Sequence, residues 1–459
     1  MAREAKNYDL TEGVIWKKLL QFFFPILFGT LFQQFYNTVD AIIVGKFVGT
    51  TALAAVGGSA ATIINLVIGF FIGIGGGAMV AVSQYFGARD GEKLSETIHT
   101  AVAFCLICGA LLTVAGVLLT RPILELMRNP ADTMEESVIY LRIYFAGTIS
   151  VLFFNVGSGI LRAVGDSRSP LYYLIVCCVL NIILDVVFVL VCGWGVAGVA
   201  WATIISITVS AVLVMVNLCT TDAIYRVHIR QVRIKGSALQ RILYLGIPAG
   251  IQSAMFSFSN LLIQISVNDL GSVSVAAWTA CGKFDGIFWS TSNSFGVALS
   301  AFVAQAFGAR KYDRMRKSVR TCLYMLLGTS AVLSVTLLVL APFGARLFSN
   351  DQEVIDLTAR ILFFFVPYYS LWCFIEVFSA TLRSVGETIR PMMISILGIC
   401  VLRIAWILFV VPHWNTIEGI SFSYPVSWGV TALVFGLYYK FGNWFDRCVK
   451  NLDAAQGVE

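Results

Sequence analysis

Residues 159–170 read GILRAVGDSRSP, and residues 380–391 read ATLRSVGETIRP. The second stretch repeats the first at an offset of 221 residues, with a shared Leu-Arg-x-Val-Gly core followed by an acidic residue. At the same offset, QYFGAR at 84–89 matches QAFGAR at 305–310. Two separate motifs at one spacing indicate that the chain is built from two copies of one unit.

Long apolar runs surround these motifs. The 459-residue chain is 58% hydrophobic and 13% charged, whereas a soluble domain carries about 25% charged residues. This composition excludes a water-soluble enzyme and a disordered chain. A bilayer core about 30 Å thick takes about 20 apolar residues per helical crossing. Twelve such runs lie near 15–39, 51–82, 97–120, 136–160, 170–192, 196–218, 242–267, 274–306, 321–341, 354–380, 391–411 and 420–440.

Each copy of the repeat contains six of these runs. Because six is even, both copies cross the membrane in the same sense. The predicted fold is therefore an all-α integral membrane protein with twelve transmembrane helices in two six-helix bundles, related by a pseudo-two-fold axis along the membrane normal. We expect an N-terminal bundle at 1–218, a basic cytoplasmic linker at 219–241, a C-terminal bundle at 242–441 and a cytoplasmic tail at 442–459.

The basic residues set the orientation. With the N-terminus inside, cytoplasmic segments hold 24 of the 32 Lys and Arg residues, and the opposite loops hold only Lys46, Arg121, Arg128 and Arg346. The positive-inside rule then places both termini in the cytoplasm and predicts a multi-pass protein of the cytoplasmic (inner) membrane. Since the net charge of +6 is spread between apolar segments, we expect the lipid bilayer and no nucleic acid as a partner.

Several motifs lack the context that a cofactor site needs. The 11 cysteines are scattered, and the Cys105-x-x-Cys108 pair lies inside an apolar run without a second pair, so helix packing is the favoured interpretation. The glycines at 69–77 are followed by no Lys-Ser/Thr and favour close helix contact over phosphate binding. We expect no cofactor, no ATP-driven transport and no catalytic residues.

Acidic residues inside apolar runs are the strongest functional signal, because charges in a bilayer are costly. Asp40 ends the first run, and Asp185 follows Asn181 by four residues in the fifth run, on one helix face. Carboxylate and amide oxygens suit a sodium ion, and a carboxylate can equally carry a proton. A helix cap at Asp40 and a packing hydrogen bond at Asp185 are the alternatives. The predicted ion or proton site comprises Asp40, Asn181, Asp185, Tyr140, Asn155 and Thr203, with possible sodium ligands in Asp40, Asn181 and Asp185.

The second half carries Asp285 and Glu376 in its apolar runs, and Arg403 could pair with either of them. A buried charge pair and a substrate-binding carboxylate are both open interpretations, since an organic cation needs a carboxylate and aromatic faces. The predicted substrate cavity comprises Asp285, Glu376, Gln34, Gln252, Phe256 and Trp289. Pro25 and Pro248, in the first and seventh runs, are predicted sites of bending and conformational change.

These features together resemble the multidrug and toxic compound extrusion (MATE) family. The resemblance rests on Val39-Asp40 with Gly45 and Gly49, on both copies of QYFGAR and LRAVGD, on NIILD at 181–185 and on GVAGVAWAT at 195–203. It covers nearly the whole chain. The pattern is most similar to the DinF-like branch, because the seventh run lacks the glutamate of the NorM-like branch.

The resemblance implies two bundles around a central cavity and a secondary antiporter. Such a protein exports small organic compounds, often cationic, in exchange for sodium ions or protons, by alternating access. It implies that Asp40, Asn181 and Asp185 bind the coupling ion, with Tyr140, Asn155 and Thr203 nearby. We expect a monomer. A lipid-linked saccharide flippase of the same superfamily is one alternative, and an intramembrane aspartyl protease is a second, although neither Asp185 nor Asp285 lies in a G-x-G-D context.

Overall fold

The computed structural model describes residues 9–346 and 351–456. Over these residues the chain is helical, with no strand. Eleven helical stretches are long and apolar enough to cross a membrane, and α6 (Met134–Ala146) with α7 (Thr148–Ala163) forms a further crossing that bends by 50°. The prediction of an all-α membrane fold with twelve transmembrane helices is confirmed.

The described chain divides into two compact units. Unit 1 contains Leu20–Gly250 with the described residues before Gly13, and unit 2 contains Gly13–Leu19 and the residues from Ile251 onward. The division falls inside the helix α10 (Gly236–Asn268), eight residues after the predicted start of the second bundle at 242. The predicted boundaries of linker and tail stay predictions.

The elements of unit 1 follow the first six apolar runs. They are α2 (Ile15–Ile43), η1 (Val44–Val48), α3 (Thr50–Gly57), α4 (Ser59–Ala88), α5 (Gly91–Leu126), α6, α7, α8 (Arg168–Asp185), η2 (Val186–Val191), α9 (Gly195–Thr220), η3 (Ile229–Gln231) and the first half of α10. Only the first turn of α2 belongs to unit 2.

Unit 2 continues from the second half of α10. It contains α11 (Ser272–Gly308), α12 (Tyr312–Ala345), α13 (Gln352–Phe365), η4 (Val366–Tyr368), α14 (Tyr369–Ser384), α15 (Ile389–Ser395), η5 (Ile396–Val401), α16 (Leu402–Phe409), η6 (Val411–His413), α17 (Ile417–Ser421), α18 (Ser423–Phe441) and α19 (Trp444–Gln456).

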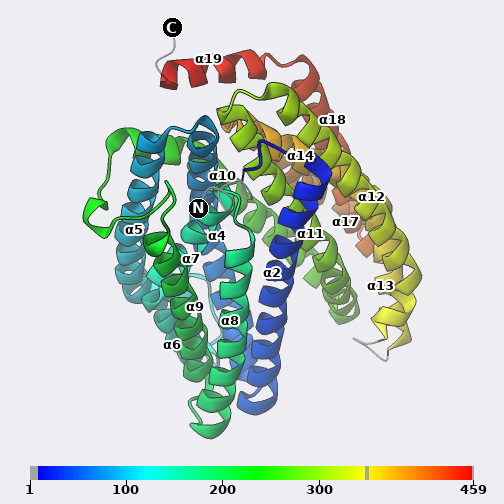
Figure 1. Ribbon diagram of the computed structural model, residues 1–459. Helices are drawn as coiled ribbons and strands as arrows, with labels where there is room; N and C mark the ends of the chain where they lie inside the picture. Colours follow the sequence, from blue (N-terminus) through cyan, green and yellow to red (C-terminus); the bar gives the residue numbers. More distant parts are fainter. Residues whose placement is uncertain (1–8, 347–350, 457–459) are drawn as a thin grey trace. The chain divides into compact units, whose positions relative to one another are not determined.

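The two units repeat one packing plan. In unit 1, α7 packs on α4, α5 and α9, and these helices run side by side in Figure 1. In unit 2, α14 packs on α11, α12 and α18. At the 221-residue offset, Thr148 at the start of α7 corresponds to Tyr369 at the start of α14. The sequence repeat is therefore also a repeat of helix contacts.

The motifs that reveal the repeat are helix ends. Gly165 and Gly386 both have positive φ, at 102° and 99°, and Arg89 and Arg310 have φ of 58° and 57°. In each case the next residue donates its N–H to a carbonyl five residues back, as from Asp166 to Leu161 at 2.9 Å. This hydrogen bond closes the last turn and turns the chain sharply. The glycines are needed because other residues rarely adopt that φ.

Glycines also allow two helices of unit 1 to touch. Gly73 and Gly77 of α4 face Gly250 and Gly246 of α10, and a Cβ built on Gly73 would lie 2.6 Å from the Cα of Gly250. Small residues four apart on both helices let two backbones approach this closely. The expected role of this glycine series in close helix contact is thus confirmed at Gly73 and Gly77, whereas Gly76 faces open space.

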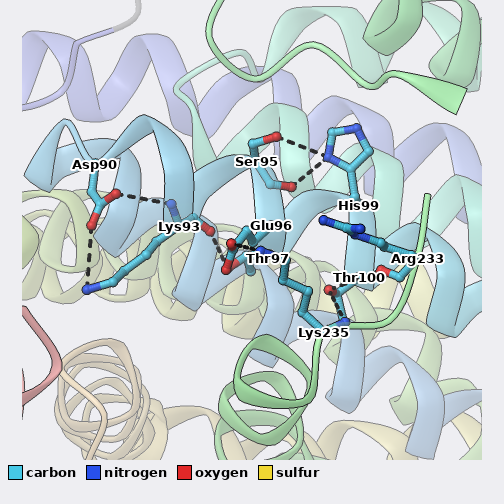
Figure 2. A network of polar contacts seen from close by, with 9 residues as sticks. All are labelled: Asp90, Lys93, Ser95, Glu96, Thr97, His99, Thr100, Arg233 and Lys235. Atoms are coloured by element: carbon cyan, nitrogen blue, oxygen red, sulfur yellow. Dashed lines mark hydrogen bonds and ion pairs between the residues drawn. The ribbon is translucent and has the colours of Figure 1, made fainter. Parts of the chain in front are cut away.

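The segment that links α9 to α10 is bound to α5 by hydrogen bonds and an ion pair. His228 donates its backbone N–H to Nε2 of His99 at 2.9 Å, and the two imidazoles are parallel. Lys235 donates its N–H to Oγ1 of Thr100 at 3.2 Å and pairs with Glu96 (Figure 2). The segment therefore covers the first turns of α5.

The last helix covers the corresponding end of unit 2. Trp444, Cys448 and Leu452 of α19 recur at a spacing of four residues and are all buried. At the far end of that helix, Asp453 accepts a hydrogen bond from Nη2 of Arg310 at 2.7 Å. Because Arg310 closes the turn after α11, α19 is held against this turn by charge and by its apolar face.

The α4–α10 contact makes a stability prediction. We expect Gly73→Ala to lower the unfolding free energy by about 1–3 kcal/mol, because the added methyl group overlaps the backbone of α10. Gly76→Ala on the same helix is the matched control and should change it by less than about 0.5 kcal/mol. The two variants are compared by thermal unfolding of the detergent-solubilised protein. Equal unfolding midpoints for Gly73→Ala and Gly76→Ala would contradict the close contact between α4 and α10.

Candidate functional site

Two carboxyl groups from distant parts of the sequence meet in unit 1. Asp40 lies near the end of α2, and Asp185 is the last residue of α8. The two carboxyl groups interact electrostatically with each other. Asp185 is completely buried, and among the described residues no donor contacts either of its oxygens or Oδ1 of Asp40. Burial without a hydrogen-bond donor leaves the pair in need of a proton or a cation.

Both acids precede a change in helix type. The π-helix η2 begins at Val186, directly after Asp185, and η1 begins at Val44, four residues after Asp40. These two π-helices contact each other. Single π-turns inside helices are rare and occur frequently at functional sites, because they change the direction in which nearby side chains point.

Tyrosines surround the acid pair. Tyr140 of α6 is buried and interacts electrostatically with both carboxyl groups. Its ring lies 6.4 Å from that of Tyr144, centroid to centroid. Tyr140 belongs to an apolar cluster with Ile43 and Val196, whereas Tyr144 packs against a second cluster that includes Cys177. The acids therefore lie near the junction of two apolar clusters, where charge is costly.

Asn181 extends this polar group by one helical turn. It is buried, and within the described chain neither its amide oxygen nor its amide nitrogen has a hydrogen-bond partner. Thr203 and Asn155 differ from it, because each bonds within its own helix. Thr203 donates to the carbonyl of Val199 at 3.0 Å, and Asn155 donates to that of Val151 at 2.8 Å.

One neighbour of the pair was not among the predicted residues. Tyr36 is buried and interacts electrostatically with Asp40. It precedes Asp40 by four residues, so the helical spacing that joins Asn181 to Asp185 was a signal for this tyrosine too.

The acids of unit 2 have partners inside the unit. Asp285 accepts a hydrogen bond from Nε1 of Trp289 at 2.8 Å and another from the hydroxyl of Tyr369. Arg403 interacts electrostatically with Asp285, whereas the charged neighbour of Glu376 is Arg383. Of the two acids that the sequence left open for Arg403, Asp285 is the one with which it interacts electrostatically.

Arg403 is itself held by aromatic and polar groups. Its guanidinium lies 3.8 Å from the ring centroid of Tyr424, and its Nε donates to Oγ of Ser427 at 3.0 Å. Trp428 is buried nearby, 6.0 Å from the same guanidinium. Asp285 and Arg403 thus form the polar centre of an aromatic core that stabilises unit 2.

The remaining residues of the predicted substrate cavity are spread over both units. Gln34 lies exposed in unit 1, whereas Gln252 is buried and Phe256 half-buried in the part of α10 that belongs to unit 2. Trp289 is half-buried beside Asp285. Unit 1 also has an apolar pocket with an empty volume of about 300 Å³, which contains none of the predicted residues and is lined by Phe71, Ile74, Gly75, Ala78, Ala101, Phe104, Cys105, Leu152, Val156 and Ile242.

Comparison with known proteins agrees with the two-copy plan. Residues 25–187 and 248–408 each match the family model described as MatE. The chain is 30% identical over 439 residues to a probable multidrug resistance protein, YoeA, of Bacillus subtilis, with 93% of this chain and 94% of the relative covered. It is 26% identical to a second probable multidrug resistance protein of that organism, YpnP, over 96% and 98% of the two chains.

A solved structure has the same fold. It is a MOP superfamily transporter from Pyrococcus furiosus, which superposes with a TM-score of 0.88 and 22% identity over 98% of this chain and 99% of that chain.

The surroundings of Arg403 lead to a prediction about the stability of the folded protein. We expect Arg403→Met to lower the unfolding free energy by about 1.5–3 kcal/mol, because it removes the hydrogen bond to Ser427 and the contact with the ring of Tyr424. Arg360→Met is the control, since that side chain is 68% exposed and its ion pair with Glu418 spans 3.8 Å. It should cost less than about 1 kcal/mol. Similar losses in thermal unfolding would mean that Arg403 contributes no more than a surface charge.

Proposed function

The chain belongs to the MatE family, and from this premise we propose that it is a secondary active antiporter. It exports small organic compounds from the cell in exchange for sodium ions or protons by alternating access. The named relatives in Bacillus subtilis are multidrug resistance proteins, which supports transport over the enzymatic alternative.

The observation that carries this proposal is the acid pair of unit 1. Asp40 and Asp185 are 145 positions apart in the sequence, yet their carboxyl groups interact, and within the described chain three of their four oxygens are buried without a hydrogen bond from another residue. Two carboxylates in such a place repel each other, so the pair is stable only when a proton or a cation neutralises part of its charge. The pair is therefore a binding site whose occupancy changes how α2 and α8 pack.

This property provides the coupling that an antiporter needs. With the pair neutralised, α2 and α8 pack closely around it. With the pair charged, repulsion favours an arrangement that separates the helices or admits water. If the exported compound binds the second arrangement better, the ion and the compound oppose each other's binding by the same factor. Export then draws its energy from the ion gradient.

Both candidate ions suit the residues present. A sodium ion takes oxygen ligands, and the oxygens of Asp40, Asp185 and Asn181 that lack a partner are of this kind. A proton shared by the two carboxyl groups would serve equally. No group of three or more His, Cys, Asp or Glu residues that could hold a metal occurs in the described part of the chain.

One of the helices that carry the site contains a proline inside it, and so does α10. Pro25 lies inside α2 and Pro248 inside α10. Each removes one backbone hydrogen bond from its helix, and we propose that both helices change their bend at these points during transport. We further propose a monomer in the cytoplasmic membrane with both termini in the cytoplasm, as the distribution of Lys and Arg residues predicts.

The antiport proposal is tested by transport in proteoliposomes. A fluorescent organic cation is loaded, and a sodium gradient or a pH gradient is imposed separately. We expect one gradient to drive export by the unaltered protein. Asp40→Asn and Asp185→Asn should each reduce this flux at least tenfold, because an amide cannot exchange a proton and binds a cation weakly.

The matched control is Asp269→Asn, which changes an exposed loop carboxylate and should leave export unchanged. Thermal unfolding confirms that each variant is folded. Gradient-driven export that survives in both folded site variants would refute the site and leave Asp285 and Glu376 as candidates. Absence of export under either gradient would favour the flippase.

Stability in salt distinguishes the two ions. If sodium binds at the pair, sodium at 100 times its dissociation constant should raise the unfolding free energy by about 2.7 kcal/mol relative to potassium. Asp185→Asn should abolish this increase, and Asp269→Asn should keep it. An equal unfolding free energy in sodium and potassium for the unaltered protein would assign the coupling to protons.

A further inference from the structure

One basic residue lies deep in a predicted crossing of unit 2. Lys283 follows the first residue of α11, Ser272, by eleven positions. At a rise of 1.5 Å per residue, this places it about 16 Å from the start of a helix that is long enough to cross a membrane. A charged group inside a crossing almost always faces water or a partner rather than lipid.

The surroundings of Lys283 are open. Its side chain is exposed, and the glycines beside it, Gly282 and Gly286, have no other atom within 4 Å of their Cβ positions. Thr279, one turn earlier, is also exposed and bonds only to a carbonyl of its own helix. This face of α11 therefore presents a cation beside Thr279 and two glycines.

No acid neutralises Lys283. Within the described chain it has no ion pair at 4.0 Å or less. Asp285, two residues later, accepts hydrogen bonds from Trp289 and Tyr369 and has Arg403 as its charged neighbour. The other intramembrane acid of unit 2, Glu376, has Arg383 beside it.

The other basic residues in the predicted crossings have surroundings that differ from those of Lys283. Arg360 pairs with Glu418 at 3.8 Å, and Arg403 is buried in the aromatic core. Arg142 is exposed but lies only eight positions after Met134, where α6 begins. That is about 12 Å along the helix, and this residue belongs to unit 1. Arg142 is therefore the comparison for Lys283.

We propose that Lys283 binds an anionic group, a carboxylate or a phosphate, of the exported compound. This inference rests on the proposed transport function and names its substrate class. The predicted carboxylates of unit 2 are poor candidates to attract an organic cation, because each already has an arginine of the same unit as its charged neighbour. An exposed ammonium group inside a predicted crossing attracts an anion, and lysine binds phosphate and carboxylate as a compact point charge.

The test compares anionic and cationic probes on purified protein. Carboxyfluorescein supplies carboxylates, riboflavin monophosphate supplies a phosphate, and ethidium supplies an organic cation. Equilibrium binding is measured by fluorescence anisotropy in detergent, so the readout does not depend on any ion gradient. The variants are Lys283→Gln, Lys283→Arg and Lys283→Glu, with Arg142→Gln as a matched loss of one exposed intramembrane charge.

We expect Lys283→Gln to weaken binding of at least one anionic probe about tenfold or more, which corresponds to the loss of one charge-assisted hydrogen bond. Lys283→Arg should restore most of the affinity, and Lys283→Glu should abolish it. Ethidium binding should not weaken in any of these variants, and Arg142→Gln should leave all three probes unaffected. The probe that responds shows whether the group is a carboxylate or a phosphate.

The proposal is overturned if neither anionic probe binds the unaltered protein, or if Lys283→Gln binds them as well as the unaltered protein does. It is also overturned if Arg142→Gln weakens them equally, since any intramembrane positive charge would then suffice. Failure of the antiport function has a different signature, because gradient-driven flux would then be absent while binding still depends on Lys283.

Discussion

Charge inside a hydrocarbon layer must find an opposite charge, a proton, a hydrogen bond or water, and this constraint governs where the polar residues of this chain lie. Backbone groups meet it within helices, which is why every described crossing is helical. Side chains meet it in two ways. In unit 2, Asp285 is supplied with two donors and a nearby guanidinium from within the unit. In unit 1, Asp40 and Asp185 interact with each other, and within the described chain Asp185 accepts no hydrogen bond from another residue.

The two units thus share a scaffold and differ in chemistry. The helix ends at Gly165 and Gly386 have the same backbone conformation, and α7 and α14 pack on corresponding helices. The polar centres do not correspond. The aromatic core around Arg403 stabilises unit 2, whereas we propose that the acid pair of unit 1 binds the coupling ion. A duplicated fold can keep one copy as a rigid support while the other responds to an ion.

Local departures from regular helix lie where the chemistry is. The π-helices η1 and η2 follow the two acids and touch each other, and α10 approaches α4 through glycines next to Pro248. Each feature costs helix stability, through poorer hydrogen-bond geometry or through the flexibility of glycine. The two π-helices directly continue the helices that carry the acid pair.

The sequence alone determined the crossings, the duplication and the acids worth attention, because apolar length, repeat spacing and the cost of buried charge are properties of the chain itself. It also placed Asn181 on the face of Asp185, since helical spacing is local. The sequence did not predict which residues of different helices contact each other. Only the tertiary structure decided that Asp40 meets Asp185, that Arg403 lies by Asp285 rather than Glu376, and that Thr203 and Asn155 bond within their own helices. Periodicity gives the face a residue occupies, but the neighbour on that face is set by how whole helices pack.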